Sequence, residues 1–421
     1  MLKMRKMKDS GIEWIGMIPE GWEVCRLKNI VACHDELRKP ISADKRENHL
    51  KLYDYYGASG VIDTIDDYNV DGTVLLIGED GANLKLRNLP LIYRASGKFW
   101  VNNHAHILIV NKKYSYDYVA YLLEAGDYSN YITGSAQPKL SQFNLMRFPV
   151  AIPNYTEQEN ISFFIHRECS KIDSILSETR SSIEEYKKLK QAVITQAVTK
   201  GVRGEREMKD SGVEWIGEIP KEWGRTKIKM IASFFNGDRT SRYPQPTDFV
   251  DDGIAFLTSR NIDGDEVDLS ETKYITKSKY NSLSGAKIQI DDIIFCLRGS
   301  VGKCAINRTL SCGTVASSLA TIRPKDIHPK YLLYFLLSNV ASIQTAVFMN
   351  GTCAANLSAE NVANYYITLP RSTEQKEIAD YLDAKCAEID GLIAKKEQLV
   401  KELESYKKSL IYEVVTGKRE V

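Results

Sequence analysis

The chain carries the same unusual phrase twice. Residues 7–22, MKDSGIEWIGMIPEGW, return 201 residues later at 208–223 as MKDSGVEWIGEIPKEW. A second pair of blocks, 156–176 and 373–393, matches in the same way at an offset of 217 residues. Between these blocks the two halves barely resemble each other. The 421 residues are therefore predicted to fold as two copies of one plan, with constant ends and a different middle in each copy.

The second repeated blocks predict two long helices, each beginning just after a proline. Thr156 with Glu159, and Ser372 with Gln375, have the spacing of a capping box at a helix start. Apolar residues then recur three and four positions apart over about five heptads, which is typical of a coiled-coil seam. Polar residues interrupt the pattern at Glu168, Thr179, Ser182, Gln196, Lys385, Lys396 and Glu413. The predicted seam residues are Ile161, Ile165, Ile172, Ile175, Tyr186, Leu189, Val193, Ile378, Leu382, Ile389, Leu392, Leu399, Leu403, Tyr406 and Leu410.

The expected partner of each apolar seam is the seam of the other long helix. Helices of about 43 residues are about 64 Å long, and antiparallel pairing places one variable region at each end. The predicted fold class is α+β: two strand-rich domains separated by two long antiparallel coiled-coil helices, with an internal pseudo-twofold repeat. The predicted segments are an arm 1–21, a domain 22–155, a helix 156–201, a linker 202–222 that repeats the arm, a domain 223–371 and a helix 372–421.

Tryptophans mark both copies of the repeated phrase. Trp14 and Trp22 lie in the first copy, and Trp215 and Trp223 in the second. Such side chains can anchor each arm against the helices, because they combine a large apolar surface with one hydrogen-bond donor. The alternative, that they belong to the core of each domain, fits nearly as well for Trp22 and Trp223.

The bulk composition is that of an ordinary globular chain. Lys and Arg number 56 against 55 Asp and Glu, a balance that neither indicates nor excludes nucleic-acid binding. The start of the chain lacks the apolar stretch of a secretory signal, and no apolar run is long enough to span a membrane. We expect a cytoplasmic location, and the cysteines fit a reducing compartment.

The sequence does not predict a metal site. None of the eight cysteines forms a CxxC pair, the usual sign of zinc. His104 and His106 alternate along a predicted strand, so both side chains face the same way. Without a third ligand nearby, a hydrogen-bonding or structural role is favoured over metal ligation.

The motifs of an enzyme are also missing. Residues 299–303, GSVGK, lack the glycine spacing and the following Ser or Thr of a nucleotide-binding P-loop. No two prolines are adjacent, which excludes the Asn/Asp-Pro-Pro-aromatic loop typical of adenine methyltransferases. Asp263, Asp265, Glu271 and Lys273 have only the loose spacing of a nuclease carboxylate set. We predict no catalytic, cofactor-binding or metal-binding residues.

Polar side chains beside glycine turns suit contacts with DNA in both variable regions. Arg, Asn and Gln can bond base edges, and Lys can reach phosphates. Taken singly each residue is more typical of a solvated loop, and it is their placement in corresponding parts of both halves that carries the interpretation. The first region offers Ser59, Glu79, Asp80, Asn83, Asn102, Asn103, His104, Gln137, Lys139 and Ser141. The second offers Arg239, Ser241, Arg242, Ser259, Arg260, Asn261, Arg298, Ser300, Lys303, Ser317, Ser318, Asn350, Thr352 and Asn356.

Over nearly its whole length the chain resembles the specificity subunits of type I restriction–modification systems. The resemblance is carried by DSGIEWIGMIPEGW and DSGVEWIGEIPKEW, and by the helix starts IPNYTEQENI and LPRSTEQKEI. Within the halves, YGASGVI, GEDGA and WVNNHAHIL resemble one type of target-recognition domain, and LTSRNID, CLRGSVGKCAI and SSLATIRP another.

The resemblance implies a non-catalytic subunit. Each domain would read one half of an asymmetric bipartite site in double-stranded DNA, and the helices would set the spacing and dock two modification (methyltransferase) subunits. Restriction subunits, which translocate and cut, would join that core. S-adenosylmethionine, ATP and Mg²⁺ would belong to these partners. Gln137 would be a candidate to stabilise a duplex from which a base has been flipped out.

Two other interpretations stay open. One is an adaptor whose end domains bind proteins, which the near-neutral charge slightly favours. The other is a self-contained nuclease or fused methyltransferase, which the missing motifs disfavour.

Overall fold

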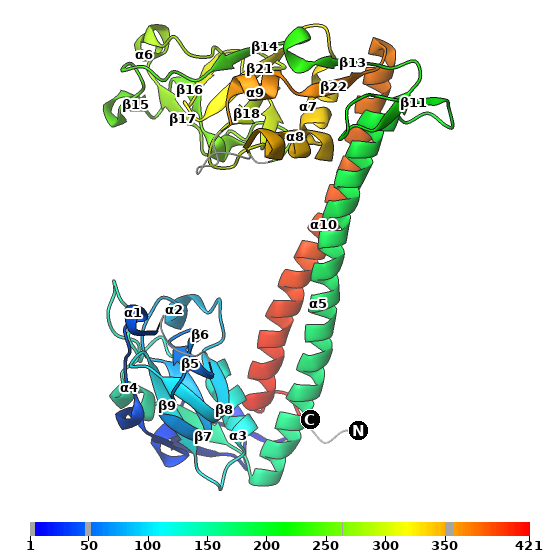
Figure 1. The fold of residues 1–421 in the computed structure, drawn as a ribbon. Coiled ribbons are helices and arrows are strands. Elements are labelled where there is room, and N and C mark those ends of the chain that lie inside the picture. Colours follow the sequence, from blue (N-terminus) through cyan, green and yellow to red (C-terminus); the bar gives the residue numbers. More distant parts are fainter. Residues whose placement is uncertain (1–4, 47–51, 263, 350–356) are drawn as a thin grey trace. The chain divides into compact units, whose positions relative to one another are not determined.

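The computed structural model describes residues 5–46, 52–262, 264–349 and 357–421, and the chain divides into two compact units (Figure 1). Unit 1 contains residues 1–179 and 398–421, and unit 2 contains residues 180–397. Each unit therefore holds one variable region together with parts of both long helices.

Unit 1 is built on a six-stranded sheet with the order β4-β9-β7-β8-β5-β6. All neighbours are antiparallel except β5 and β8. The end of β7, VLLIG, is buried throughout, so this central strand is covered on both faces. The strands are β4 (Val31–Cys33), β5 (Tyr53–Gly57), β6 (Gly60–Ile65), β7 (Val70–Gly78), β8 (Ile92–Val101) and β9 (Ala105–Val110). The short helices are η1 (Leu27–Asn29), η2 (Asp35–Leu37), α1 (Ala43–Arg46), α2 (Asn83–Leu86), α3 (Tyr116–Ala125) and α4 (Gln142–Met146).

Unit 2 contains two four-stranded sheets in place of the single large one. The first has the order β14-β21-β18-β19, and the second β15-β17-β16-β20, in which β16 and β20 run parallel. The strands are β14 (Ala232–Asn236), β15 (Phe249–Val250), β16 (Ile254–Leu257), β17 (Lys273–Ile275), β18 (Ile293–Cys296), β19 (Cys304–Ile306), β20 (Gly313–Val315) and β21 (Leu319–Pro324). The helices are η3 (Ile228–Met230), η4 (Pro246–Asp248), η5 (Ser259–Asn261), α6 (Lys277–Ser282), α7 (Pro329–Leu337), α8 (Asn339–Met349) and α9 (Ala359–Ala363).

A pair of two-stranded elements is repeated in both units. In unit 1 a hairpin joins β1 (Met7–Asp9) to β2 (Met17–Pro19), and β3 (Glu23–Arg26) pairs with β10 (Pro149–Ile152). In unit 2 the hairpin joins β11 (Met208–Asp210) to β12 (Glu218–Pro220), and β13 (Gly224–Lys227) pairs with β22 (Tyr366–Leu369). The residues pair in the same register in both units. The β3–β10 and β13–β22 pairs therefore bring together the start and the end of each variable region.

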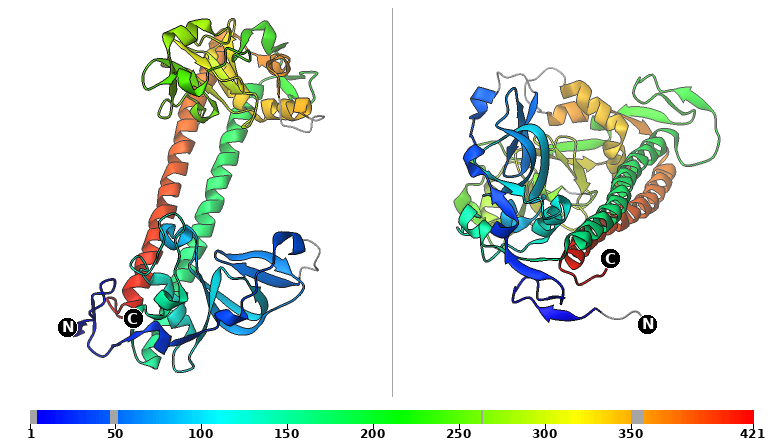
Figure 2. Two further views of the ribbon diagram at one scale, coloured as in Figure 1. Left: turned by 90° about the vertical axis from the view of Figure 1, so that its left-hand side faces the viewer. Right: turned by 90° about the horizontal axis from the view of Figure 1, so that it is seen from below.

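The two long helices predicted from the repeated blocks are present. They are α5 (Tyr155–Lys200) and α10 (Ser372–Val415), drawn from two further sides in Figure 2. In unit 2, Lys190 of α5 pairs with Asp390 of α10 at 2.6 Å, and Lys396 lies 5.7 Å above the ring of Tyr186, so the two segments run antiparallel.

Unit 1 repeats the same contact between the helices. Here Lys407 of α10 pairs with Asp173 of α5 at 2.6 Å. Asp173 and Asp390 occupy equivalent positions of the repeated blocks, and so do Lys190 and Lys407. The same ion pair therefore joins the helices once in each unit, with the roles of the two helices exchanged.

The predicted seam needs a correction in its register. Ile175 is 45% exposed, Leu189 48%, Leu399 41% and Tyr406 50%, so these four side chains lie outside the buried stripe and the prediction is wrong for them. Ile161, Ile165, Ile172, Ile378, Leu382, Ile389 and Leu410 are buried, and Tyr186, Val193, Leu392 and Leu403 are half-buried.

A cysteine in each helix explains the shift. The buried residues of α5 are spaced four apart from Ile161 to Ile165, and again from Ile165 to Cys169, which is 6% exposed. As a result the buried residue after Ile172 is Leu176 and not Ile175. Cys386 fills the equivalent place in α10 at 2% exposure. The sequence interpretation treated Glu168 and Lys385 as polar breaks, but cysteine beside them acts as a small hydrophobic residue and continues the stripe.

The repeated phrase joins each arm to the start of a long helix. In unit 1, Trp22 Nε1 donates to Glu157 Oε1 at 3.1 Å, and Arg5 pairs with the same carboxylate at 2.6 Å. The guanidinium of Arg5 lies 6.0 Å from the centre of the Trp22 ring. Because Trp22 is also buried in the core of unit 1, it is both an anchor to α5 and a core residue.

Unit 2 contains the same three side chains in the same arrangement. Trp223 Nε1 donates to Glu374 Oε2 at 3.0 Å, and Arg206 pairs with Glu374 at 2.7 Å. The guanidinium of Arg206 lies 5.3 Å from the centre of the Trp223 ring. We call each of these groups the Arg–Glu–Trp cluster.

The other repeated tryptophan differs between the units. Trp14 Nε1 donates to the carbonyl of Pro149 at 3.2 Å, and its ring stacks on Phe148 at 5.3 Å. The indole N–H of Trp215 is buried, and it has no hydrogen-bond partner among the residues that the structure describes.

Among the described residues no single helix has the length and apolar character needed to cross a membrane, and one bent pair, α7 with α8, meets that test jointly with 61° between its members.

The corrected stripe predicts different stability losses for two leucines of unit 2. Leu382 is fully buried and Leu189 is 48% exposed. Leu382→Ala is expected to lower the free energy of unfolding by about 2–5 kcal/mol, because it leaves a cavity. Leu189→Ala is expected to change it by no more than about 0.5 kcal/mol. Urea denaturation of the full chain, followed by circular dichroism, measures both, and equal losses would contradict the assigned stripe.

Candidate nucleic-acid interface

In unit 1 the polar loops predicted to contact DNA meet at one edge of the six-stranded sheet. The backbone N–H of Glu79 donates to the carbonyl of His104 at 2.8 Å, and Leu140 N–H donates to the carbonyl of Glu79 at 2.7 Å. Asp80 and Lys139 form an isolated β-bridge. These bonds join the end of β7 to the β8–β9 turn and to the segment 133–140.

The turn between β5 and β6 reaches the same edge. A Cβ on Gly78 would lie 2.6 Å from the carbonyl oxygen of Ala58, so only glycine allows the turn to approach β7 this closely. Ser59, in this turn, is exposed. We call the residues at this place, Ser59, Glu79, Asp80, Asn103, His104, Gln137 and Lys139, the unit 1 edge.

Ion pairs hold the unit 1 edge in place. Arg38 and Lys139 both contact the carboxylate of Glu79, the latter at 3.1 Å. Burial tends to raise the pKa of Glu79, but the hydrogen bonds from Arg38 and Lys139 outweigh it and lower the pKa. Asp80 accepts a hydrogen bond from His104 Nδ1 at 2.8 Å. The sequence analysis missed Arg38, because no motif distinguishes this arginine from others at the surface.

Several predicted residues of unit 1 hold loops instead of presenting side chains. Asn102 is 5% exposed and accepts a hydrogen bond from the backbone N–H of His104 at 2.8 Å. The Asn83 amide bonds the backbone of Leu89 and Pro90. Ser141 caps the start of α4. The prediction of a direct DNA contact is wrong for Asn102, because its side chain is buried. Ser59, Asn103, His104, Gln137 and Lys139 are exposed, and a DNA contact stays a prediction for them.

In unit 2 a buried aspartate shapes the loop that carries Arg239 and Arg242. Asp238 is 4% exposed, and its two carboxylate oxygens accept hydrogen bonds from Thr240 and Ser284 at 2.7–3.1 Å. Burial alone would raise the pKa of Asp238, but these four hydrogen bonds outweigh it and hold the pKa well below its usual range. The loop is therefore built around a carboxylate anion.

The Arg239 loop lies against the segment with Ser317 and Ser318. Arg239 Nε donates to the carbonyl of Ser317 at 3.3 Å. The Cβ of any other residue at Gly237 would lie 2.2 Å from the carbonyl oxygen of Ala316, so this close approach requires glycine.

The β18–β19 turn adjoins the same segment. Leu297 N–H donates to the carbonyl of Ser318 at 2.9 Å. Arg298, Ser300 and Lys303 in this turn are exposed, and Gly299 turns the chain with a φ of +73°. We call Arg239, Arg298, Ser300, Lys303, Ser317 and Ser318 the unit 2 edge.

The remaining predicted residues of unit 2 lie in the Arg239 loop, on η5 or outside the described residues. Asn261 is 1% exposed and bonds the backbone of Thr258 and Asp268, so its predicted DNA contact is wrong. Ser241, Arg242 and Arg260 are exposed and Ser259 is half-buried. Asn350, Thr352 and Asn356 lie outside the described residues, as does Asp263 of the carboxylate set that was considered for a nuclease.

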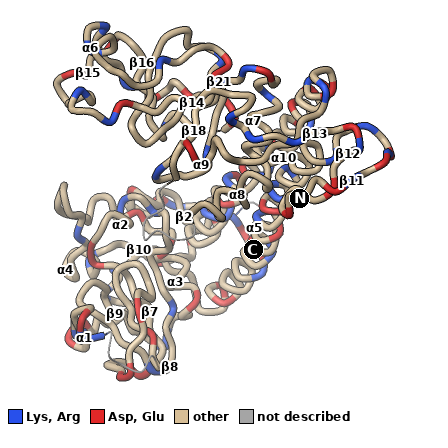
Figure 3. The backbone as a smooth tube through the Cα atoms, turned by 45° about the horizontal axis from the view of Figure 1, so that its top comes forward, with Lys and Arg blue, Asp and Glu red and all other residues tan. Residues whose placement is uncertain are grey.

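The two edges differ in their balance of basic and acidic side chains. Basic and acidic residues are interspersed along the chain, and neither sign dominates (Figure 3). At the unit 1 edge the cations Arg38 and Lys139 are paired with Glu79. The unit 2 edge carries Arg239, Arg298 and Lys303, and the nearby carboxylate of Asp238 is buried beneath the loop. The second edge is therefore the more basic surface.

Comparisons with known proteins agree on one family. A family model described as type I restriction modification DNA specificity domain matches residues 19–185 and 220–402. The chain is 23% identical over 292 residues to the type I restriction enzyme MjaVIII specificity subunit of Methanocaldococcus jannaschii. The alignment covers 68% of this chain and 65% of that relative, which is less than two thirds of its length. It is 25% identical over 438 residues to the putative type I restriction enzyme MjaX specificity subunit of the same organism, with coverages of 96% and 95%.

One solved structure shares the fold. It is described as "Structural basis underlying complex assembly and conformational transition of the type I R-M system". The TM-score is 0.71 at 13% identity, and the alignment covers 96% of this chain and 99% of that chain.

The buried carboxylate of Asp238 predicts a pH-dependent difference between two variants. Because its folded-state pKa lies below the unfolded value, it contributes stability above an unfolded pKa of about 3.9, and this contribution is lost as the pH falls further. At neutral pH, Asp238→Asn is expected to cost about 1–3 kcal/mol, since the amide cannot accept all four bonds.

The control is Asp268→Asn, an exposed aspartate that accepts hydrogen bonds from the backbone and side chain of Ser270. Its substitution is expected to lower stability much less than Asp238→Asn does. Thermal melts at a series of pH values measure both. A loss for Asp238→Asn that stays constant below pH of about 4 would contradict the assignment.

Proposed function

The chain belongs to the type I restriction modification DNA specificity family, and we propose that it is the non-catalytic subunit that selects the DNA sequence for a type I restriction–modification complex. The observation that carries the proposal is a repeated frame around two different domains. The frame consists of the Arg–Glu–Trp cluster, the β3–β10 or β13–β22 pair, and the ion pair between the long helices. Inside it, one unit holds a six-stranded sheet and the other two four-stranded sheets.

Two different domains in one frame suit an asymmetric bipartite site in double-stranded DNA. In this proposal the unit 1 edge reads one half-site and the unit 2 edge the other. Arg239 and Arg298 can bond guanine edges or phosphates, and Lys303 can contact a phosphate. Phosphate contacts supply salt-dependent affinity, and base contacts supply specificity. The pair of long helices sets the spacing between the half-sites.

Two copies of one frame suit two copies of one partner. Leu189 and Tyr406 occupy equivalent positions of the repeated blocks, and both are about half exposed although they are large and apolar. A single exposed apolar side chain is common at a protein surface, so it is the recurrence at equivalent positions of the two helices that supports an interface here. We propose that they dock two modification (methyltransferase) subunits, one on each helix, and that restriction subunits join this core.

The chemistry lies with the partners in this proposal. S-adenosylmethionine, ATP and Mg²⁺ are bound by the modification and restriction subunits. The target base leaves the stack to reach a methyltransferase pocket, while this chain keeps the complex on its site.

Methylome sequencing tests the proposal. One host expresses the modification subunit alone, and the other expresses it with this chain. A new bipartite methylated motif is expected only in the second host. If the three-subunit assembly forms but no new motif is found, the assignment fails and an adaptor that binds proteins becomes the better interpretation.

A variant in the same assay tests the docking surface separately. Leu189→Asp with Tyr406→Asp is expected to abolish the new methylation and the co-purification of the modification subunit, with an unchanged melting temperature of the free chain. Ser405→Asp, at an exposed polar neighbour of Tyr406, is the control and should retain both. Full methylation by the double variant would move the docking surface elsewhere on the chain.

A further inference from the structure

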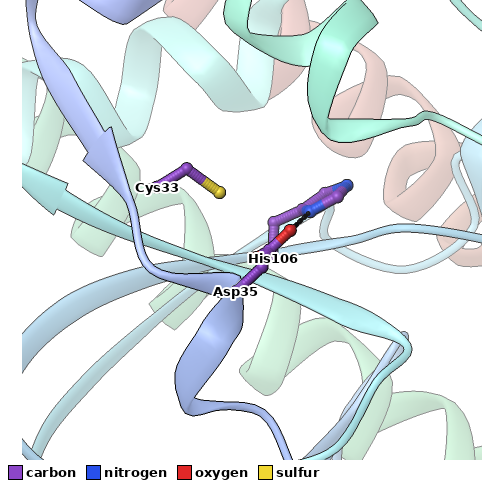
Figure 4. Close-up of side chains that lie close together, drawn as sticks. All are labelled: Cys33, Asp35 and His106. Carbon is purple, nitrogen blue, oxygen red and sulfur yellow. Dashed lines mark hydrogen bonds and ion pairs between the residues drawn. The ribbon is translucent and has the colours of Figure 1, made fainter.

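Three side chains of unit 1 with metal-ligand chemistry lie close together (Figure 4). Cys33 ends β4, Asp35 begins η2 and His106 lies on β9. The cysteine sulfur, a carboxylate oxygen and a ring nitrogen all lie within 4.8 Å of one another. The ligands thus come from three separate elements that converge on one point.

Both ring nitrogens of His106 face an oxygen that accepts hydrogen bonds. The ring is fully buried, its Nε2 lies 2.8 Å from the carbonyl oxygen of Leu140, and its Nδ1 lies 2.7 Å from Asp35 Oδ2. Both partners are acceptors. A neutral imidazole carries one N–H, and when Nε2 donates it to the Leu140 carbonyl, Nδ1 is left with a lone pair that faces Asp35.

We propose that Cys33 Sγ, the Asp35 carboxylate and His106 Nδ1 bind one transition-metal ion of the zinc class. Thiolate, imidazole and carboxylate together are ligands that zinc accepts. The bond from His106 Nε2–H to a backbone carbonyl is the contact that usually orients a metal-bound histidine. Three protein ligands leave a fourth position for water, and Cys33 is only half-buried, so the ion has access from solvent.

The charges around the three ligands permit a divalent ion. A divalent cation with one thiolate and one carboxylate is neutral overall. Arg38 lies 3.1 Å from Asp35 Oδ2, and its charge is matched by Glu79. Carboxylates bound to metals are commonly hydrogen-bonded in turn, so this contact is compatible with Asp35 as a ligand.

The ion would tie the sheet to the loops of the unit 1 edge. Its histidine bonds Leu140, the residue after Lys139, and its aspartate contacts Arg38, which holds Glu79. The sequence analysis did not predict this site, because Asp35 and His106 are 71 residues apart and no CxxC pair marks it.

Cobalt titration of the purified full chain tests the site without any partner, so the result is independent of the proposed function. After removal of metals with a chelator, Co²⁺ is added and the optical spectrum recorded. We expect one equivalent of Co²⁺ to give the visible bands of a tetrahedral site and a charge-transfer band from thiolate. Excess Zn²⁺ should abolish both signals.

Matched cysteine variants decide the outcome. Cys33→Ser is expected to remove the charge-transfer band and weaken binding at least about tenfold. Cys25→Ser, which alters another half-buried thiol of the same unit, should leave both unchanged. His106→Gln provides a second test if the thiol variant unfolds. Absence of cobalt binding, or binding that Cys33→Ser does not affect, would overturn the proposal.

Discussion

The attachment of each arm to the start of a long helix is the interaction on which the rest of the fold depends. In unit 2, Glu374 is only 3% exposed at its side chain and pairs with Arg206 while it accepts from Trp223. Removing one member of such a buried pair costs about 3–5 kcal/mol, because the other charge stays buried without compensation. The pair of Arg5 and Glu157 in unit 1 is more exposed, at 32% and 21%, so its loss should cost less.

This attachment explains how two unlike domains occupy equivalent places. Just after each cluster the chain enters β3 or β13, and just before each helix it leaves through β10 or β22, paired in the same register. Each variable region is therefore closed at its base by the frame, and within each unit one tyrosine of the region also bonds a long helix: Tyr118 donates to the carbonyl of Val415, and Tyr331 to that of Val198. In the proposed function, the repeated frame would serve two copies of one partner, and the differing interiors would read two different half-sites.

Much of the frame could be predicted from the sequence, because two repeated segments within one chain are expected to fold in the same way. The long helices followed from the apolar pattern, but the register was wrong at Ile175, Leu189, Leu399 and Tyr406, where cysteine was not counted as apolar. The candidate interface was harder to predict. Asn102 and Asn261 have the chemistry of base contacts, but their loops use that chemistry internally. Arg38 and His106 act through residues distant in sequence, and only the fold brings these together.

An exchange of one variable region tests most directly whether frame and domains are separable. Residues 23–154 would be replaced by the corresponding region of another family member, which leaves Trp22 and Glu157 in place. The methylated motif would then be determined with the same modification subunit. We expect one half of the motif to change and the other half to stay the same. A change in both halves, or no methylation by a folded and assembled complex, would contradict it.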